Sequence, residues 1–162
     1  MAFDVVIKNG RYFDGTGGAS AIRNVGIREG HVAAVTEESI EGVEEIDASG
    51  QWVMPGLIDI HTHYDVEVLN GPGLSESLRH GVTTVVVGSC SISTVHVGGV
   101  DAGDLFGRVE AIPRDYVIAA IDQHKNWSNA EEYVRAVEAR PLGPNVTAFI
   151  GHSDMRTAAM GL

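Results

Sequence analysis

Apolar and polar residues alternate over short stretches in the first 55 residues, a pattern typical of β-strands with one buried face. Ala21–Arg28 shows this alternation most clearly. The dipeptides Asn9-Gly10 and Glu29-Gly30 favour turns. We therefore expect a small β-module of short hairpins over residues 1–55. The predicted strands are Asp4–Lys8, Arg11–Phe13, Ala21–Arg28 and His31–Val35, and two further strands are marked by Ile46 and by Trp52–Val53.

The pattern changes at Gly56, where apolar residues begin to form uninterrupted runs. Such runs are typical of parallel strands covered on both faces, and they occur at Leu57–Ile60, Val82–Val87 and Asn145–Ile150. Amphipathic segments lie between them, so the order of elements predicts an α/β fold of parallel strands and crossover helices. The predicted helices are Leu74–His80, Asp104–Glu110, Arg114–Ile121 and a helix that starts at a Ser128–Glu131 capping box and ends before Pro141.

Polar side chains follow each of these three apolar runs. His61 and His63 come directly after the first run, Cys90 follows the second, and His152 follows the third. The C-terminal ends of parallel strands meet at one rim of an α/β barrel, where active sites lie. We therefore expect these four side chains to lie close together, although they are distant in sequence.

His61, His63 and Cys90 have the chemistry of a zinc site. Histidines two apart in an extended segment point the same way, so both imidazoles can reach one metal ion. A lone cysteine is usually a small buried apolar residue, but beside two imidazoles it becomes a candidate thiolate ligand. Thiolate and imidazole together favour zinc over magnesium or calcium. The sequence therefore predicts that these three residues hold zinc.

The residues near the third strand end allow several interpretations. His152 is a candidate metal ligand, a hydrogen-bond donor to substrate or a packed core histidine. Arg156, one helical turn further, can pair with a carboxylate through two hydrogen bonds or can be a solvated helix residue. Asp65, two residues after His63, is expected to orient a metal ligand or to cap the following loop.

Composition narrows the class of protein. The chain has 162 residues, 44% of them hydrophobic and 20% charged, as in an ordinary globular protein. Its net charge of −11 argues against a surface for nucleic acid or an anionic membrane, and no run of about 18 apolar residues is present to span a membrane. One cysteine cannot form an internal disulfide, and the start lacks the features of a signal peptide. We therefore expect a cytoplasmic protein.

The segment Ile46–His63, which contains Pro-Gly-Leu-Ile-Asp-Ile-His-Thr-His, resembles the segment that leads into the barrel of the metal-dependent amidohydrolase superfamily. Later stretches are similar to the N-acyl-D-amino-acid deacylase (D-aminoacylase) branch in particular. The resemblance covers essentially the whole chain and is to the N-terminal portion of that family. The later stretches are His80–Cys90, Arg108-Val109-Glu110 with Pro113, and the run from Asn145-Val146 through Gly151-His152 to Arg156.

The resemblance implies a distorted (β/α)₈ TIM-like barrel and a small β-sandwich built from both ends of the chain. Residues 1–55 would form the N-terminal part of the sandwich, and residues 56–162 the first three βα units of the barrel. In the family, the residues that match His61, His63 and Cys90 hold one or two zinc ions. The sequence Gly-Ser-Cys-Ser at 88–91 departs from the family's usual Gly-Asn-Cys-Gly, which leaves the substrate open.

A complete barrel needs about 250 residues, so the resemblance also implies a C-terminal chain or subunit that completes the barrel and supplies the catalytic aspartate. The implied activity is zinc-dependent hydrolysis of a linear amide in an N-acyl-D-amino acid, with His152 or Arg156 contacting the substrate carboxylate. Two alternatives stay open. One is a cyclic-amide hydrolase of the hydantoinase or dihydroorotase type, which typically uses a carboxylated lysine rather than a cysteine. The other is a barrel fragment retained as a non-catalytic subunit.

Overall fold

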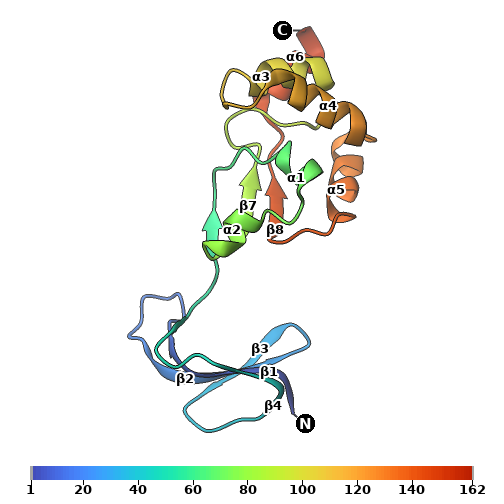
Figure 1. The fold of residues 1–162 in the computed structure, drawn as a ribbon. Coiled ribbons are helices and arrows are strands. Elements are labelled where there is room, and N and C mark those ends of the chain that lie inside the picture. The colour runs from blue at the N-terminus through green and yellow to red at the C-terminus, as the bar shows by residue number, and fades with distance from the viewer. Residues whose placement is uncertain (1, 162) are drawn as a thin grey trace. The chain divides into compact units, whose positions relative to one another are not determined.

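The structure is a computed structural model that describes residues 2–161. The chain divides between Pro55 and Gly56 into two compact units, and most of their elements are labelled in Figure 1. This boundary lies where the hydrophobic pattern changes from short alternating stretches to continuous runs. No helix within the described residues is long and apolar enough to cross a membrane.

The first unit is built around one long strand, β1 (Phe3–Tyr12). It pairs antiparallel with β2 (Ala21–Arg28) and parallel with β4 (Gly42–Asp47) and the short β5 (Trp52–Val53). On the far side of β2 lies β3 (His31–Thr36), which is antiparallel to β2. The small β-module expected from the alternating pattern is therefore present as a twisted sheet. Its buried side chains include Val6, Val25 and Ala48.

One of the two predicted turns in this unit is wrong. Asn9-Gly10 does not end a strand but forms a bulge inside β1, where Asn9 has φ 61°. Neighbouring strands hold it there, because the Asn9 backbone N–H donates to Asn24 Oδ1 at 2.9 Å and its side-chain amide donates to Asp47 Oδ1 at 3.2 Å. The other turn, at Glu29-Gly30, does join β2 to β3, with positive φ at both residues.

The second unit contains the parallel sheet predicted from the continuous apolar runs. Its strands are β6 (Leu57–Asp59), β7 (Val82–Val87) and β8 (Asn145–Ala148), in the order β6-β7-β8. Helix α2 (Ser75–Arg79) connects the first pair, and α5 (Ala130–Glu138) precedes β8. Both pairings are parallel, so the α/β character is confirmed.

Burial of the first of these strands differs from the prediction. Val85 and Val87 of β7 are fully buried, as a central strand requires, but Ile58 of β6 is 63% exposed and the following Ile60 is 73% exposed. Strand β6 lies at the edge of the sheet, where its apolar side chains lack the packing partners of a covered strand. A continuous apolar run predicts a strand that is covered on both faces. For β6 the covering surface is not part of the described residues.

Helices α3 (Gly99–Phe106) and α4 (Arg114–His124) form an insertion between β7 and α5, at the end toward which the strands β7 and β8 point (Figure 1). The predicted helix Asp104–Glu110 is displaced, since α3 starts earlier and ends at Phe106. The start of α3 packs closely on α4 because Gly99 has no side chain: a Cβ there would lie 2.4 Å from Asp122 Oδ1 of α4. Because α3 ends at Phe106, Glu110 lies in the turn after α3 rather than on a helix.

The start of α5 also differs by one residue from the predicted capping box. Asn129, not Ser128, is the N-cap, and its side chain accepts a hydrogen bond from the Glu132 N–H at 3.0 Å. The Glu132 carboxylate in turn accepts from the Ser128 N–H at 2.7 Å. An asparagine caps a helix as well as a serine does, so the helix can begin one residue later than the capping box predicts.

Helix α6 (His152–Met160) braces the loop that follows β7. The buried carboxylate of Asp154 accepts hydrogen bonds from the Ser93 hydroxyl at 2.6 Å and from the N–H groups of Val95 and Val97 at 3.0 and 2.8 Å. The loop between β7 and α3, which carries Cys90, is therefore tied to the first turn of α6. Hydrogen bonds to a charged acceptor are the stronger ones in proteins.

Replacing Asp154 with alanine should therefore destabilise this unit strongly. The change leaves a hydroxyl and several amides buried without an acceptor, at a cost of about 3 kcal/mol or more in the free energy of unfolding. Urea unfolding of the full chain followed by circular dichroism measures this loss. Asp115→Ala, at an exposed position in the first turn of α4, is the control and should cost less than about 1 kcal/mol. Equal losses in the two variants would contradict the bracing role.

Candidate metal centre

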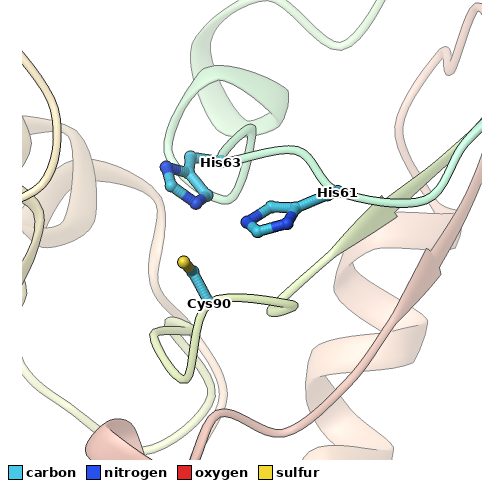
Figure 2. Close-up of side chains that lie close together, drawn as sticks. All are labelled: His61, His63 and Cys90. Atoms are coloured by element: carbon cyan, nitrogen blue, oxygen red, sulfur yellow. The ribbon is translucent and has the colours of Figure 1, made fainter.

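Two histidines and one cysteine meet beyond the C-terminal ends of β6 and β7 (Figure 2). One nitrogen each of His61 and His63 and the sulfur of Cys90 all lie within 4.8 Å of one another. The two imidazole rings are 5.3 Å apart between centroids. The structure thus brings together three of the four side chains that the strand-end pattern predicts to be neighbours, and their role as ligands stays a prediction.

The residue between the two histidines fixes their direction. Thr62 is buried, and both its N–H and its hydroxyl donate to the carbonyl of Val86 in β7, at 3.1 and 2.8 Å. Side chains alternate along an extended segment. Because Thr62 points at β7, His61 and His63 both point to the other side, where Cys90 lies.

A tight turn after β7 positions Cys90. Gly88 has φ 78°, and a Cβ there would lie 2.2 Å from the carbonyl oxygen of Phe149, so only glycine fits. The Ser89 hydroxyl donates to the carbonyl of Ile60 at 2.9 Å, which ties the loop to the histidine segment. The Cys90 thiol is exposed and is not in a disulfide, so its sulfur is accessible for coordination.

His63 has two ring nitrogens in different surroundings. Its Nδ1 forms a hydrogen bond with a carboxylate oxygen of Glu110, from the turn after α3. Its Nε2 is buried and has no hydrogen-bond partner among residues 2–161. Buried polar atoms normally have a partner, so the Nε2 of His63 is a polar atom in need of one.

The donor set fits zinc. Thiolate and imidazole are the ligands of protein zinc sites, with Zn–S near 2.3 Å and Zn–N near 2.0–2.1 Å. Two ligand atoms on one tetrahedral zinc lie about 3.3–3.7 Å apart, and the candidate ligand atoms of this cluster lie within 4.8 Å of one another. Three protein ligands with an open side are typical of catalytic zinc rather than structural zinc.

A cavity of about 460 Å³ opens beside the two histidines. Three carboxylates line it, which makes this side of the site negative. Such a surface favours a cation and disfavours an anion. The residues that line the cavity are Asp59, His61, Thr62, His63, Tyr64, Glu67, Glu110 and Ile112.

The remaining predicted residues lie outside this cluster. His152 is exposed at the first position of α6, and the metal-ligand cluster found among the described residues does not include it. Arg156 is exposed one turn further along α6. Both are free to meet a substrate, and that role stays a prediction.

Asp65 makes no hydrogen bond to either cluster histidine among the described residues, so its expected role in orienting a ligand stays a prediction. It is fully buried, and neither carboxylate oxygen has a hydrogen-bond partner within the described part of the chain. Burial raises the pKa of the Asp65 carboxyl to about 7. The carboxylate that contacts His63 is instead that of Glu110.

Two residues of the site were missed by sequence reasoning. Glu110 is 47 positions from His63, and its only sequence signal is its place in the Arg108-Val109-Glu110 stretch. Asp154 lies between His152 and Arg156, and nothing in the periodicity distinguishes it from a solvated acid in the first turn of a helix.

The chain is similar to known proteins over most of its length. A model described as amidohydrolase family matches residues 44–160. An uncharacterized protein of Mycobacterium tuberculosis is 53% identical over 165 residues, which cover all of this chain and 27% of that protein.

Two solved structures align with nearly the whole chain. N-acyl-D-glutamate deacylase from Bordetella bronchiseptica, complexed with zinc and a phosphonate mimic of the tetrahedral intermediate, aligns with a TM-score of 0.77 and 30% identity over 99% of this chain. D-aminoacylase, a protein with a binuclear metal centre, aligns with a TM-score of 0.82 and 30% identity over 98% of this chain.

The chain spans only 27–32% of the length of these proteins, so it holds part of their fold. The resemblance drawn from the sequence to the N-terminal portion of D-aminoacylases is confirmed. Because the family model matches most of the residues, including His61, His63 and Cys90, the chain belongs to the amidohydrolase family.

Proposed function

We propose that this chain is the N-terminal, zinc-binding part of an amidohydrolase that removes the acyl group from N-acyl-D-amino acids. The observation that carries the proposal is the meeting of one thiol and two imidazoles within 4.8 Å at the ends of neighbouring parallel strands. The similarity to N-acyl-D-glutamate deacylase and D-aminoacylase supports the substrate class.

In this proposal the Nε2 of His63, one ring nitrogen of His61 and the sulfur of Cys90 would hold zinc. Bound zinc supplies a Lewis acid for the amide carbonyl and lowers the pKa of water near it. His152 or Arg156, exposed on α6 next to the braced Cys90 loop, would bind the carboxylate of the substrate.

Proton transfer in the proposed reaction needs a further carboxylate. Of the acids beside the histidines, Glu110 is engaged with His63. The resemblance to D-aminoacylases implies that the acid–base role belongs to an aspartate outside these 162 residues, which would take a proton from water and pass it to the leaving amine.

The proposed enzyme is complete only with a further region or subunit. Strands β6 and β8 are at the two edges of a three-stranded parallel sheet, and apolar side chains such as Ile58, Ile60 and Phe149 are exposed beside them. Open strand edges and wide apolar faces favour association with further protein. The two relatives of known structure are about three times as long as this chain, which covers 32% and 31% of them.

Removal of the Cys90 sulfur tests the metal site. Cys90→Ala in the complete protein should lose most bound zinc and most activity, because a thiolate is the strongest zinc ligand of the three. Elemental analysis after dialysis measures the zinc content. His96→Ala, at an exposed histidine outside the cluster, should keep wild-type zinc. Unchanged zinc in Cys90→Ala would rule out the ligand role.

A panel of amides tests the reaction. The complete protein should hydrolyse N-acyl-D-amino acids and leave N-acyl-L-amino acids intact, because the proposed substrates are derivatives of D-amino acids. It should also leave hydantoins intact, because cyclic-amide hydrolases typically use a carboxylated lysine where this site has a cysteine. Release of free amino acid measures turnover. Hydantoin opening without deacylation would favour the cyclic-amide alternative, and a metal-free protein with no turnover would favour the non-catalytic one.

Replacing Arg156 tests substrate binding. A guanidinium that holds a substrate carboxylate contributes about 1.5–3 kcal/mol, so Arg156→Ala should raise KM about 10- to 100-fold at nearly constant kcat. Steady-state kinetics on an N-acyl-D-amino acid measure this. Arg135→Ala, at an exposed arginine of α5, should leave KM unchanged. A KM of Arg156→Ala equal to that of the control would remove Arg156 from the site.

A further inference from the structure

We infer that Glu110 is a positioning residue for the metal ligand His63, fixing which of its ring nitrogens faces the metal. The inference rests on the proposed zinc site. It adds a residue from the helical insertion to a site otherwise built from two strand ends. Glu110 is the carboxylate that bonds to a cluster imidazole in the structure.

The argument starts from the two nitrogens of the imidazole. A neutral histidine carries its proton on one nitrogen and a lone pair on the other, and the hydrogen bond of one determines the role of the other. The carboxylate of Glu110 can only accept, so Nδ1 must donate to it. The lone pair is therefore on Nε2, the buried nitrogen that lacks a partner among residues 2–161.

The orientation of the ring agrees with this assignment. In Figure 2 one ring nitrogen of His63 faces the side on which His61 and Cys90 lie, and the other points away from them. Glu110 bonds to Nδ1 and so lies across the ring from Nε2, the nitrogen that would hold the metal. It acts on the metal through His63 rather than as a ligand itself.

The insertion holds Glu110 firmly enough for this role. The N–H of Glu110 donates to the carbonyl of Phe106 at 2.8 Å, and the side chain of Phe106 is fully buried. Helix α3, which ends at Phe106, packs closely on α4 because Gly103 has no side chain to separate them. The acceptor for His63 is thus carried by a packed element and not by a free loop.

The neighbouring acid Glu67 provides a comparison. It lines the same cavity as Glu110, but it is exposed in the first turn of α1 (Glu67–Asn70). A general electrostatic effect of acids on the metal would involve both residues. A positioning role would involve only Glu110, which bonds to the imidazole of His63. Mutation of residues that hydrogen-bond to a metal ligand typically changes metal affinity about 10- to 100-fold.

Zinc affinity in three variants of the complete protein tests the inference, measured by competition with a chromophoric chelator. Glu110→Ala should bind zinc about 10- to 100-fold more weakly than wild type. Glu110→Gln should recover most of this loss, because its amide oxygen still accepts from Nδ1. Glu67→Ala should bind zinc like wild type. Cobalt substitution adds a readout, since the thiolate-to-cobalt absorption should persist in Glu110→Gln.

Each failure has a distinct meaning. Wild-type affinity in Glu110→Ala, or equal losses in Glu110→Ala and Glu110→Gln, would overturn the positioning role while leaving the zinc site intact; the second result would indicate direct coordination by the carboxylate. Equal losses in Glu110→Ala and Glu67→Ala would indicate a general charge effect and also overturn it. Absence of zinc from the wild-type protein would overturn the proposed function and this inference together.

Discussion

The parallel pairing of β6 with β7 is the constraint on which the rest of the site depends. It places the segment 60–63 beside the end of β7, where the carbonyl of Val86 accepts two hydrogen bonds from Thr62. Those bonds turn Thr62 inward, and the alternation of side chains then directs His61 and His63 to the side where Cys90 lies. A register shift of one residue would reverse this arrangement and direct both histidines away from the thiol.

Around this pairing, later segments of the chain act as supports. Helix α6 ties down the loop after Cys90 through the buried carboxylate of Asp154. The insertion of α3 and α4 brings Glu110 to the Nδ1 of His63. Both supports use a carboxylate that accepts from fixed donors. The strand ends therefore supply the donor atoms, and helices that follow in sequence hold them in place.

The sequence predicts the parts of this molecule that depend on short-range periodicity. Uninterrupted apolar runs predict the parallel strands, and the polar residues after them predict the meeting of His61, His63 and Cys90. Predictions fail where a distant contact decides. Asn9-Gly10 is held in a bulge by Asn24 and Asp47, and the Glu110–His63 contact joins segments 47 residues apart. Ile58 is exposed because no surface covers it among the described residues, and the residue pattern of one strand cannot predict whether such a surface is present.

The charge of the site would limit how the proposed substrate, an N-acyl amino acid, approaches it. Such a substrate is an anion at neutral pH, whereas the cavity beside the histidines is lined by Asp59, Glu67 and Glu110. A bound divalent cation would offset part of this negative charge, but the carboxylate of the proposed substrate would still need a cationic partner away from the three acids. No lysine or arginine lines the cavity among the described residues. In the proposed enzyme the cationic partner would therefore come from another side, either from the exposed Arg156 of α6 or from the region that would complete the barrel. The amide would then face the proposed metal ligands, and the carboxylate would point away from the acids.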